Sequence, residues 1–198
     1  MKKTQAVRDI SAPARINNDW KEGVSTWDFF NKLFGRKAEQ QEAKVEFIIQ
    51  NRTILAPISG KVLAQADIPD ETFAQGILGP GCGIEPSEKT VYAPFDGVVS
   101  QVPSTLHAVG LTSDDGIELL IHVGMDTVEM QGKGFKGLVK EGEAVKAGTP
   151  LLTIDLRAIK AAGYPATTAV IVTNSDELGE LKMLAEGSVS AGTPLIKF

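Results

Sequence analysis

The chain has 198 residues, enough for one hydrophobic core and an appendage, and its hydrophobic content of 42% is ordinary for a soluble protein. A net charge of −5 without a sustained basic stripe argues against a nucleic-acid partner. The single cysteine, Cys82, excludes an internal disulfide and a thiolate metal cage, and no stretch reaches the ~20 apolar residues that span a bilayer. We therefore expect a soluble protein of the cytoplasm.

Residues 1–44 form a predicted N-terminal extension, flexible over most of its length. Within it the stretch STWDFFNKLFGRK has aromatic residues at helical spacing, which predicts a short amphipathic helix near residues 26–35. One interpretation is a helix that docks on its own domain. The other is a helix whose residues 26–37 contact an anionic membrane surface or a partner's groove.

Residues 45–198 are predicted to form one folded domain, because turn signals recur about every 8 to 12 residues, as in an all-β protein. We expect an antiparallel β-sandwich or barrel. Only the stretch DLRAIKAAGY has a helical pattern inside this domain. The expected strands are residues 45–50, 53–56, 60–65, 91–93, 97–102, 106–111, 117–123, 151–154, 168–172 and 194–197.

Internal repetition is visible in this domain. The stretch APISGKV at 56–62 recurs as APFDGVV at 93–99, and AGTPL occurs at 147–151 and again at 191–195. Repeated turns of this kind predict two related β-units packed face to face. The repeats indicate a fold and carry no information about chemistry.

One of the two histidines, His122, lies in an apolar run that predicts a strand over residues 117–123. Alternation places the odd-numbered residues of this strand on the core face and the even-numbered residues on the outer face. His122 is therefore expected on the outer face, beside Leu120.

The second histidine, His107, precedes a hairpin turn with the sequence SDDG at 113–116. With all four residues in the loop, His107 lies directly opposite His122, with Cβ atoms ~4.5–5.5 Å apart. A loop of two residues makes the pair diagonal on the same face. A loop of three residues would place the two histidines on opposite faces.

Two facing imidazoles suit few functions, and two unrelated surface histidines are the alternative. A metal site needs about three protein ligands as a rule, and Asp126 is the one obvious candidate nearby. A neutral histidine can act as a nucleophile while a second one donates a proton to the anionic adduct, with Thr105 fixing the tautomer of His107. Phosphate is the adduct that uses all these groups. Because the chain has no Gly-rich nucleotide loop, a protein and not ATP is the expected phosphoryl donor.

The chain from about residue 45 to 198 resembles the glucose-type enzyme IIA of the bacterial phosphoenolpyruvate-dependent sugar phosphotransferase system. The matching stretches are APISGKV, IPDETFAQGILGPGCGIEP, APFDGVV, TLHAVGL, GIELLIHVGMDTVEMQGKGF and VKEGEAVKAGTPL. The resemblance implies a duplicated-hybrid-motif fold in which His122 becomes a tele-phosphohistidine. It implies phosphoryl transfer from the phosphocarrier HPr to His122 and onward to the cysteine of an enzyme IIB domain, which phosphorylates sugar during uptake.

The same resemblance implies roles for the neighbouring residues. Two of them serve the phosphohistidine: His107 stabilises it and Thr105 orients His107. The acidic flanking residues would be Asp70 and Asp126, and the partner-binding apolar residues would be Phe73, Ile77 and Leu78. Simpler interpretations are turn residues for the two aspartates and core packing for Phe73.

No cofactor and no metal is required, although His107 and His122 could bind zinc in a complex. The expected partners are HPr, an enzyme IIB domain of a sugar permease and regulated enzymes or transporters, and a monomer is expected. A regulatory docking protein of the same fold is the alternative function. A zinc peptidase would need a third histidine, and a biotinyl or lipoyl carrier would need a lysine turn where the chain has TIDLRAIKAAG.

Overall fold

The computed structural model describes residues 47–48 and 51–198, and the chain from Lys44 to Phe198 forms one compact unit. The predicted helix near residues 26–35 and the predicted membrane contact of residues 26–37 lie outside the described residues. The strand predicted over residues 45–50 is not seen at its two described residues, which adopt no regular structure. Among the described residues, none of the helices has the length and apolar character that crossing a bilayer requires.

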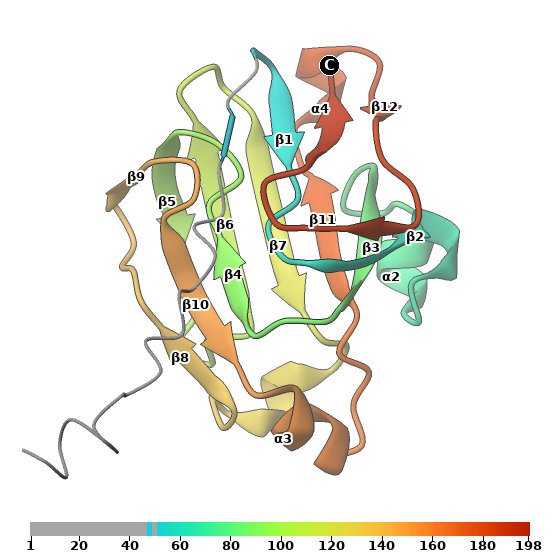
Figure 1. Cartoon of the computed structure of the whole chain (residues 1–198), viewed down its shortest axis with the longest axis vertical. Helices are drawn as coiled ribbons and strands as arrows, with labels where there is room; N and C mark the ends of the chain where they lie inside the picture. The colour runs from blue at the N-terminus through green and yellow to red at the C-terminus, as the bar shows by residue number, and fades with distance from the viewer. Residues whose placement is uncertain (1–46, 49–50) are drawn as a thin grey trace, which may run out of the picture. The chain divides into compact units, whose positions relative to one another are not determined.

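Short strands make up most of the regular structure (Figure 1). The strands are β1 (Thr53–Leu55), β2 (Gly60–Ala64), β3 (Gly81–Pro86), β4 (Thr90–Tyr92), β5 (Gly97–Gln101), β6 (Ala108–Ser113), β7 (Glu118–Val123), β8 (Phe135–Gly137), β9 (Ala144–Val145), β10 (Pro150–Ile154), β11 (Thr168–Val172), β12 (Lys182–Met183), β13 (Ser188–Val189) and β14 (Pro194–Lys197). The helices are η1 (Gln65–Asp67), α2 (Glu71–Ala74), η2 (Thr127–Met130), α3 (Leu156–Ala161) and α4 (Ser175–Leu178).

The strands form three antiparallel sheets, which confirms the all-β prediction. The large sheet has eight strands in the order β13-β2-β3-β11-β7-β6-β5-β9. Two small sheets have three strands each, in the orders β1-β14-β12 and β4-β10-β8. Figure 1 shows α2 beside β2 and β3, on the opposite side of the view from the β4-β10-β8 sheet.

The internal duplication is confirmed by equivalent hydrogen bonds in the two halves. Ala56 donates to the Thr193 carbonyl and accepts from the Gly192 N–H. Ala93, its counterpart in the second repeat, donates to Thr149 and accepts from Gly148 in the same way. In each half the Ala-Pro-x-x-Gly turn carries the chain from a small sheet into the large one. The large sheet is therefore two equivalent four-stranded halves that meet where β11 pairs with β7.

Side-chain alternation along β7 follows the prediction. The side chains of Ile117, Leu119, Ile121 and Val123 are at most 2% exposed and belong to the main core between the sheets. Leu120 and His122 are half-buried on the opposite, outer face. There a second, smaller cluster covers part of the sheet, and its buried members are Ile68, Phe73, Met125, Ala169 and Ile171.

Strand β3 was not predicted as a strand, because GCGIEP has two glycines and no alternating pattern. A Cβ atom at Gly81 would lie 2.0 Å from the Val170 carbonyl oxygen, so a glycine is needed for β3 to approach β11. The strands β8, β9, β12 and β13, of two or three residues, are too short to produce a recognisable pattern. The same holds for α2 and α4, of four residues each.

The one helix predicted inside the domain is confirmed as α3, and Asp155 explains where it begins. The Asp155 carboxylate accepts hydrogen bonds from the backbone N–H groups of Arg157 and Ala158, which have no partner within the helix.

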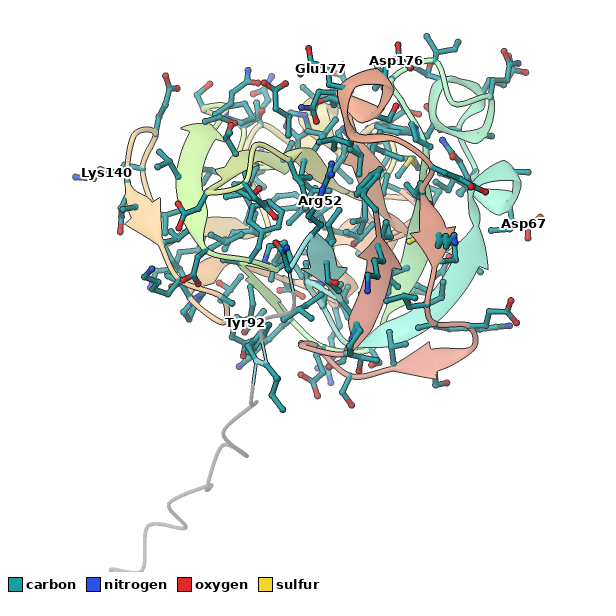
Figure 2. The ribbon with its side chains drawn as sticks, turned by 90° about the horizontal axis from the view of Figure 1, so that it is seen from above. Arg52, Asp67, Tyr92, Lys140, Asp176 and Glu177 are labelled. Atoms are coloured by element: carbon teal, nitrogen blue, oxygen red, sulfur yellow. The ribbon has the colours of Figure 1, made fainter. Side chains whose placement is uncertain are left out.

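Arg52 connects the start of β1 to α4. Its guanidinium donates to the Leu178 carbonyl at 2.9 Å, and its backbone N–H donates to the Asp115 carboxylate. In Figure 2 Arg52 lies inside the outline of the domain, whereas Asp176 and Glu177 of α4 lie at its rim. The bond to Leu178 joins segments that are 126 residues apart, and the bond to Asp115 ties the start of β1 to the turn after β6.

Candidate functional site

His122 lies near the end of β7, on the outer face of the large sheet. The strands on either side place small residues opposite it, Ala108 on β6 and Ala169 on β11. The Phe73 ring packs against its imidazole with 5.0 Å between ring centroids. His122 is therefore held in a shallow apolar setting and still reaches the surface.

The register of the β6–β7 hairpin differs from the expected one. Ala108, and not His107, pairs with His122. The turn has three residues, 114–116, because the Ser113 N–H donates to the Ile117 carbonyl. A loop of this length was expected to place the two histidines on opposite faces of the sheet.

That consequence is wrong, because His107 does not belong to the strand. It lies one residue before β6, directly after Leu106, whose left-handed backbone (φ 56°) interrupts the strand alternation. The His107 ring reaches the same face as His122, with 4.9 Å between centroids and 75° between ring planes. The two imidazoles meet as expected, by a different backbone route.

Thr105 contacts the far side of His107. Its hydroxyl oxygen lies 2.7 Å from Nδ1 of His107. Burial lowers the pKa of His107 below its usual 6.5, which favours the neutral ring. A hydroxyl that donates to Nδ1 leaves the proton of the neutral ring on Nε2.

The pKa of His122 is lowered from 6.5 to about 4, chiefly because burial penalises the imidazolium and secondly because His107 is nearby. The Gly124 carbonyl and the carboxylates of Asp70 and Asp126 act in the opposite direction but do not outweigh burial. At pH 7 the ring is neutral and keeps a free lone pair on one nitrogen. Its Nδ1 is buried and has no hydrogen-bond partner of normal geometry within the described part of the chain.

Both predicted flanking aspartates hold turns and also affect His122. The Asp70 carboxylate accepts the backbone N–H of Phe73 at 3.0 Å and begins α2. Asp126 has a left-handed backbone (φ 58°) before η2. The turn interpretation therefore describes their local structure, while their charges favour the protonated form of His122.

The three predicted apolar contact residues differ in exposure. Phe73 is only 7% exposed, so most of its ring is unavailable to a partner. Ile77 is 67% exposed and Leu78 is 40% exposed, and the two exposed apolar side chains are adjacent in sequence. They lie after α2, in the stretch made of α2 and the residues that lead to β3, called here the α2 loop (residues 71–80).

Residues 52–178 match the family described as phosphoenolpyruvate-dependent sugar phosphotransferase system, EIIA 1. The chain belongs to this EIIA family. Among similar proteins, a "PTS system glucose-specific EIIA component" of Staphylococcus epidermidis is 43% identical over 148 residues, covering 75% of this chain and 84% of that protein. The solved "glucose permease IIA" from Mycoplasma capricolum is 31% identical with a TM-score of 0.69, covering 77% of this chain and 98% of that one.

EIIA domains also occur in longer relatives. A "PTS system beta-glucoside-specific EIIBCA component" of Dickeya chrysanthemi is 42% identical over 147 residues, covering 74% of this chain. This chain spans only 23% of the length of that relative. The fold of the EIIA family agrees with the predicted one, and the site described above lies within the matched residues.

The described part of this EIIA domain has no group of three or more His, Cys, Asp or Glu side chains arranged to hold a metal ion. The two facing imidazoles supply two ligands at most. A zinc ion between His107 and His122 would therefore need its remaining ligands from another protein.

Two features of the site were not predicted from the sequence. The first is the contact between Phe73 and the His122 ring, since Phe73 was expected either to face a partner or to pack in the core, and not against the histidine. The second is Gln65 in η1, whose side chain makes three hydrogen bonds around the α2 loop. A glutamine in a three-residue helix belongs to no recognisable pattern, so no sequence signal identified it.

Proposed function

We propose that this EIIA domain is a phosphocarrier that accepts a phosphoryl group on His122 from phospho-HPr and passes it to the cysteine of an EIIB domain. The observation that carries the proposal is the neutral, half-buried His122 ring in contact with a second imidazole. Because Nδ1 is buried, Nε2 is the nitrogen that a partner can reach. The phosphorylated form is therefore the tele-phosphohistidine.

In the first step the Nε2 lone pair of His122 attacks the phosphorus of the phosphohistidine on HPr. The donor P–N bond breaks, and its electron pair stays on the HPr imidazole. In the second step a cysteine thiolate of EIIB attacks the phosphorus, and the electron pair of the P–Nε2 bond returns to His122. A neutral acceptor ring is required in the first step, because an imidazolium has no lone pair to offer.

His107 stabilises the phosphoryl group in this scheme. With the Thr105 hydroxyl donating to Nδ1 of His107, the Nε2–H of that ring is free to donate to a phosphoryl oxygen. The negative charges of Asp70 and Asp126 repel the phosphoryl group while it is bound to His122. This repulsion favours its transfer to the next protein. The burial that keeps His122 neutral also limits the access of water to the phosphohistidine.

The exposed side chains of Ile77 and Leu78 supply an apolar contact for both partners. Since HPr and EIIB must each reach the same Nε2, one surface has to serve both proteins in turn. The sugar is decided by the permease and not by this domain. We propose that the domain works as a monomer at the cytoplasmic side of such a permease.

The test is the intact mass of the protein after mixing with phosphoenolpyruvate, enzyme I and HPr, with each component omitted in turn. One added phosphoryl group that is labile in acid and absent without HPr is the expected result. An unchanged mass, with the domain folded and HPr itself phosphorylated, would contradict the proposal. A regulatory docking protein that keeps the fold without transfer is the second candidate, and that outcome would support it.

A further inference from the structure

The amide nitrogen and the amide oxygen of the Gln65 side chain both form hydrogen bonds with backbone groups in and next to the α2 loop. Its Nε2 donates to the Phe73 carbonyl at 3.0 Å and to the Gly79 carbonyl at 2.8 Å. Its Oε1 accepts from the Gly81 N–H at 2.9 Å. One side chain therefore connects the end of α2, the end of the loop and the start of β3.

The geometry suits an amide and no other side chain of this size. Two carbonyl acceptors and one N–H donor need two donors and one acceptor on one planar group, which glutamine supplies. A glutamate would repel the two carbonyl oxygens. A methionine would leave the Gly79 carbonyl and the Gly81 N–H without the partner that Gln65 provides, whereas the Phe73 carbonyl would still accept from the Gly76 N–H.

The two bonded carbonyls bracket the exposed part of the loop. Phe73 precedes and Gly79 follows the segment that carries Ile77 and Leu78. Two glycines in or directly after this segment have a positive φ, Gly76 at 70° and Gly79 at 125°. Backbone hydrogen bonds from Gly76, Ile77 and Gly79 shape this segment internally. The Gln65 side chain adds bonds that tie the segment to η1 and to the start of β3, and so restrict where the two exposed apolar side chains lie.

We propose that Gln65 is a positioning residue for protein docking: its amide holds the α2 loop in the shape that presents Ile77 and Leu78 to the partner protein. This inference rests on the proposed function, because it assumes that the partners dock there. A loop that is already ordered loses less conformational entropy when a partner binds, so the amide raises affinity without touching the partner.

The same amide also acts close to the nucleophile. Phe73 provides one of the two carbonyls that Gln65 holds, and the Phe73 ring packs against His122. The docking segment and the wall of the phosphorylation site therefore share one anchor. Figure 2 shows the next residues of η1, marked by Asp67, at the margin of the domain opposite Lys140.

The experiment compares Gln65→Met, Gln65→Glu and wild type in transfer from phospho-HPr, with Ile154→Val as a control of reduced stability. Ile154 lies in β10, on the other side of the domain from α2 (Figure 1). We expect both Gln65 variants to raise KM for phospho-HPr about tenfold while kcat stays within about twofold, as for lost docking affinity. Ile154→Val should leave KM unchanged.

Amide hydrogen exchange gives a readout that needs no partner. The Gly81 N–H donates to Gln65, so its exchange should be at least about tenfold faster in Gln65→Met, and the amides in the middle of β11 should keep their protection. An unchanged KM in both Gln65 variants, with wild type active, would overturn the docking role and leave the proposed function standing. An equally protected Gly81 would overturn the anchoring role. A wild type that accepts no phosphoryl group would refute the proposed function and the docking role together.

Discussion

The Phe73 ring packs against the imidazole of His122, with 5.0 Å between centroids and 53° between ring planes, while the Phe73 N–H donates to Asp70. Phe73, for which the sequence left partner contact and core packing open, is thus a wall of the His122 site. Because this wall excludes water from the ring, it contributes to the burial that lowers the pKa of His122.

Replacing Phe73 by leucine should therefore raise the pKa of His122 from about 4 towards its usual 6.5. Leucine keeps an apolar side chain, so we expect the domain to remain folded with a loss of about 1–2 kcal/mol in stability. The measurement is an NMR titration of the His122 ring proton. Ile77→Ala, at a residue that is 67% exposed, is the matched control and should leave this pKa where it is. Identical titration curves for Phe73→Leu and wild type would contradict the role of the wall.

The buried neutral ring also predicts how stability depends on pH. Between pH 6.5 and about 4 the unfolded chain binds a proton at residue 122 that the folded chain does not. The free energy of unfolding should therefore fall with decreasing pH by about 1.4 kcal/mol per unit from this group, and by about 3 kcal/mol in total.

Urea unfolding of wild type and His122→Gln at several pH values between 4 and 7 would measure this slope, because the other acidic groups are common to both proteins. We expect the variant to lose less stability than wild type as the pH falls. Parallel curves would mean that the ring is solvated in solution.

His107 and Thr105 should affect transfer and leave the acceptor in place. We expect His107→Ala to slow the phosphorylation of His122 by roughly 100-fold, since a hydrogen-bond donor to the phosphoryl group is lost. Thr105→Val should slow it by about tenfold, because the His107 tautomer is no longer fixed. Rapid-quench measurement with phospho-HPr gives both rates, and His122→Ala should show no labelling while keeping its fold. Labelling of His122→Ala would show that His122 is not the residue that accepts the phosphoryl group.

The exposed loop residues should contribute to affinity and not to stability. Ile77→Ala and Leu78→Ala are expected to weaken HPr binding by about 1–2 kcal/mol each, as for apolar contacts in the centre of an interface. Their melting temperatures should stay close to that of wild type, because these side chains are 67% and 40% exposed. Met183→Ala, in β12 and 39% exposed, is a control of similar exposure outside the α2 loop. Calorimetric titration with HPr would rank the three variants, and equal affinities would place the docking surface elsewhere.

The core face of the large sheet could be predicted from the sequence, because the odd-numbered residues of 117–123 are all aliphatic and the two Ala-Pro-x-x-Gly turns mark equivalent places. The contact between the two histidine rings was predicted correctly, but the pairing register of β6 and β7 was not. His107 lies outside β6, next to the left-handed backbone of Leu106, and a left-handed leucine has no signature in a sequence.

The α2 loop shows a different limit. Its apolar residues were recognised through the resemblance to a family, but the bonds that order it come from Gln65, through contacts spanning 8 to 16 positions. A long-range side-chain hydrogen bond leaves no periodicity behind. Strand β3 was missed for a related reason, since its glycines serve the close approach to β11 and weaken every strand signal.

The duplicated sheet gives each position of one half a counterpart in the other. Gly60 and Gly97 begin equivalent strands and pair with Pro86 and Ser113. Following the pairing outward from there gives Ile171 on β11 as the counterpart of His122 on β7.

The two halves of the sheet differ in the connection that follows their first equivalent strand. The connection 65–80 of the first half is long enough to fold over the isoleucine and hide it, whereas its counterpart, 102–107, is short and leaves the histidine open on that side. The second half carries the histidine, and the first half carries the longer connection that covers the sheet. Neither half would be expected to work alone, and a substitution in either connection changes the surroundings of the same ring.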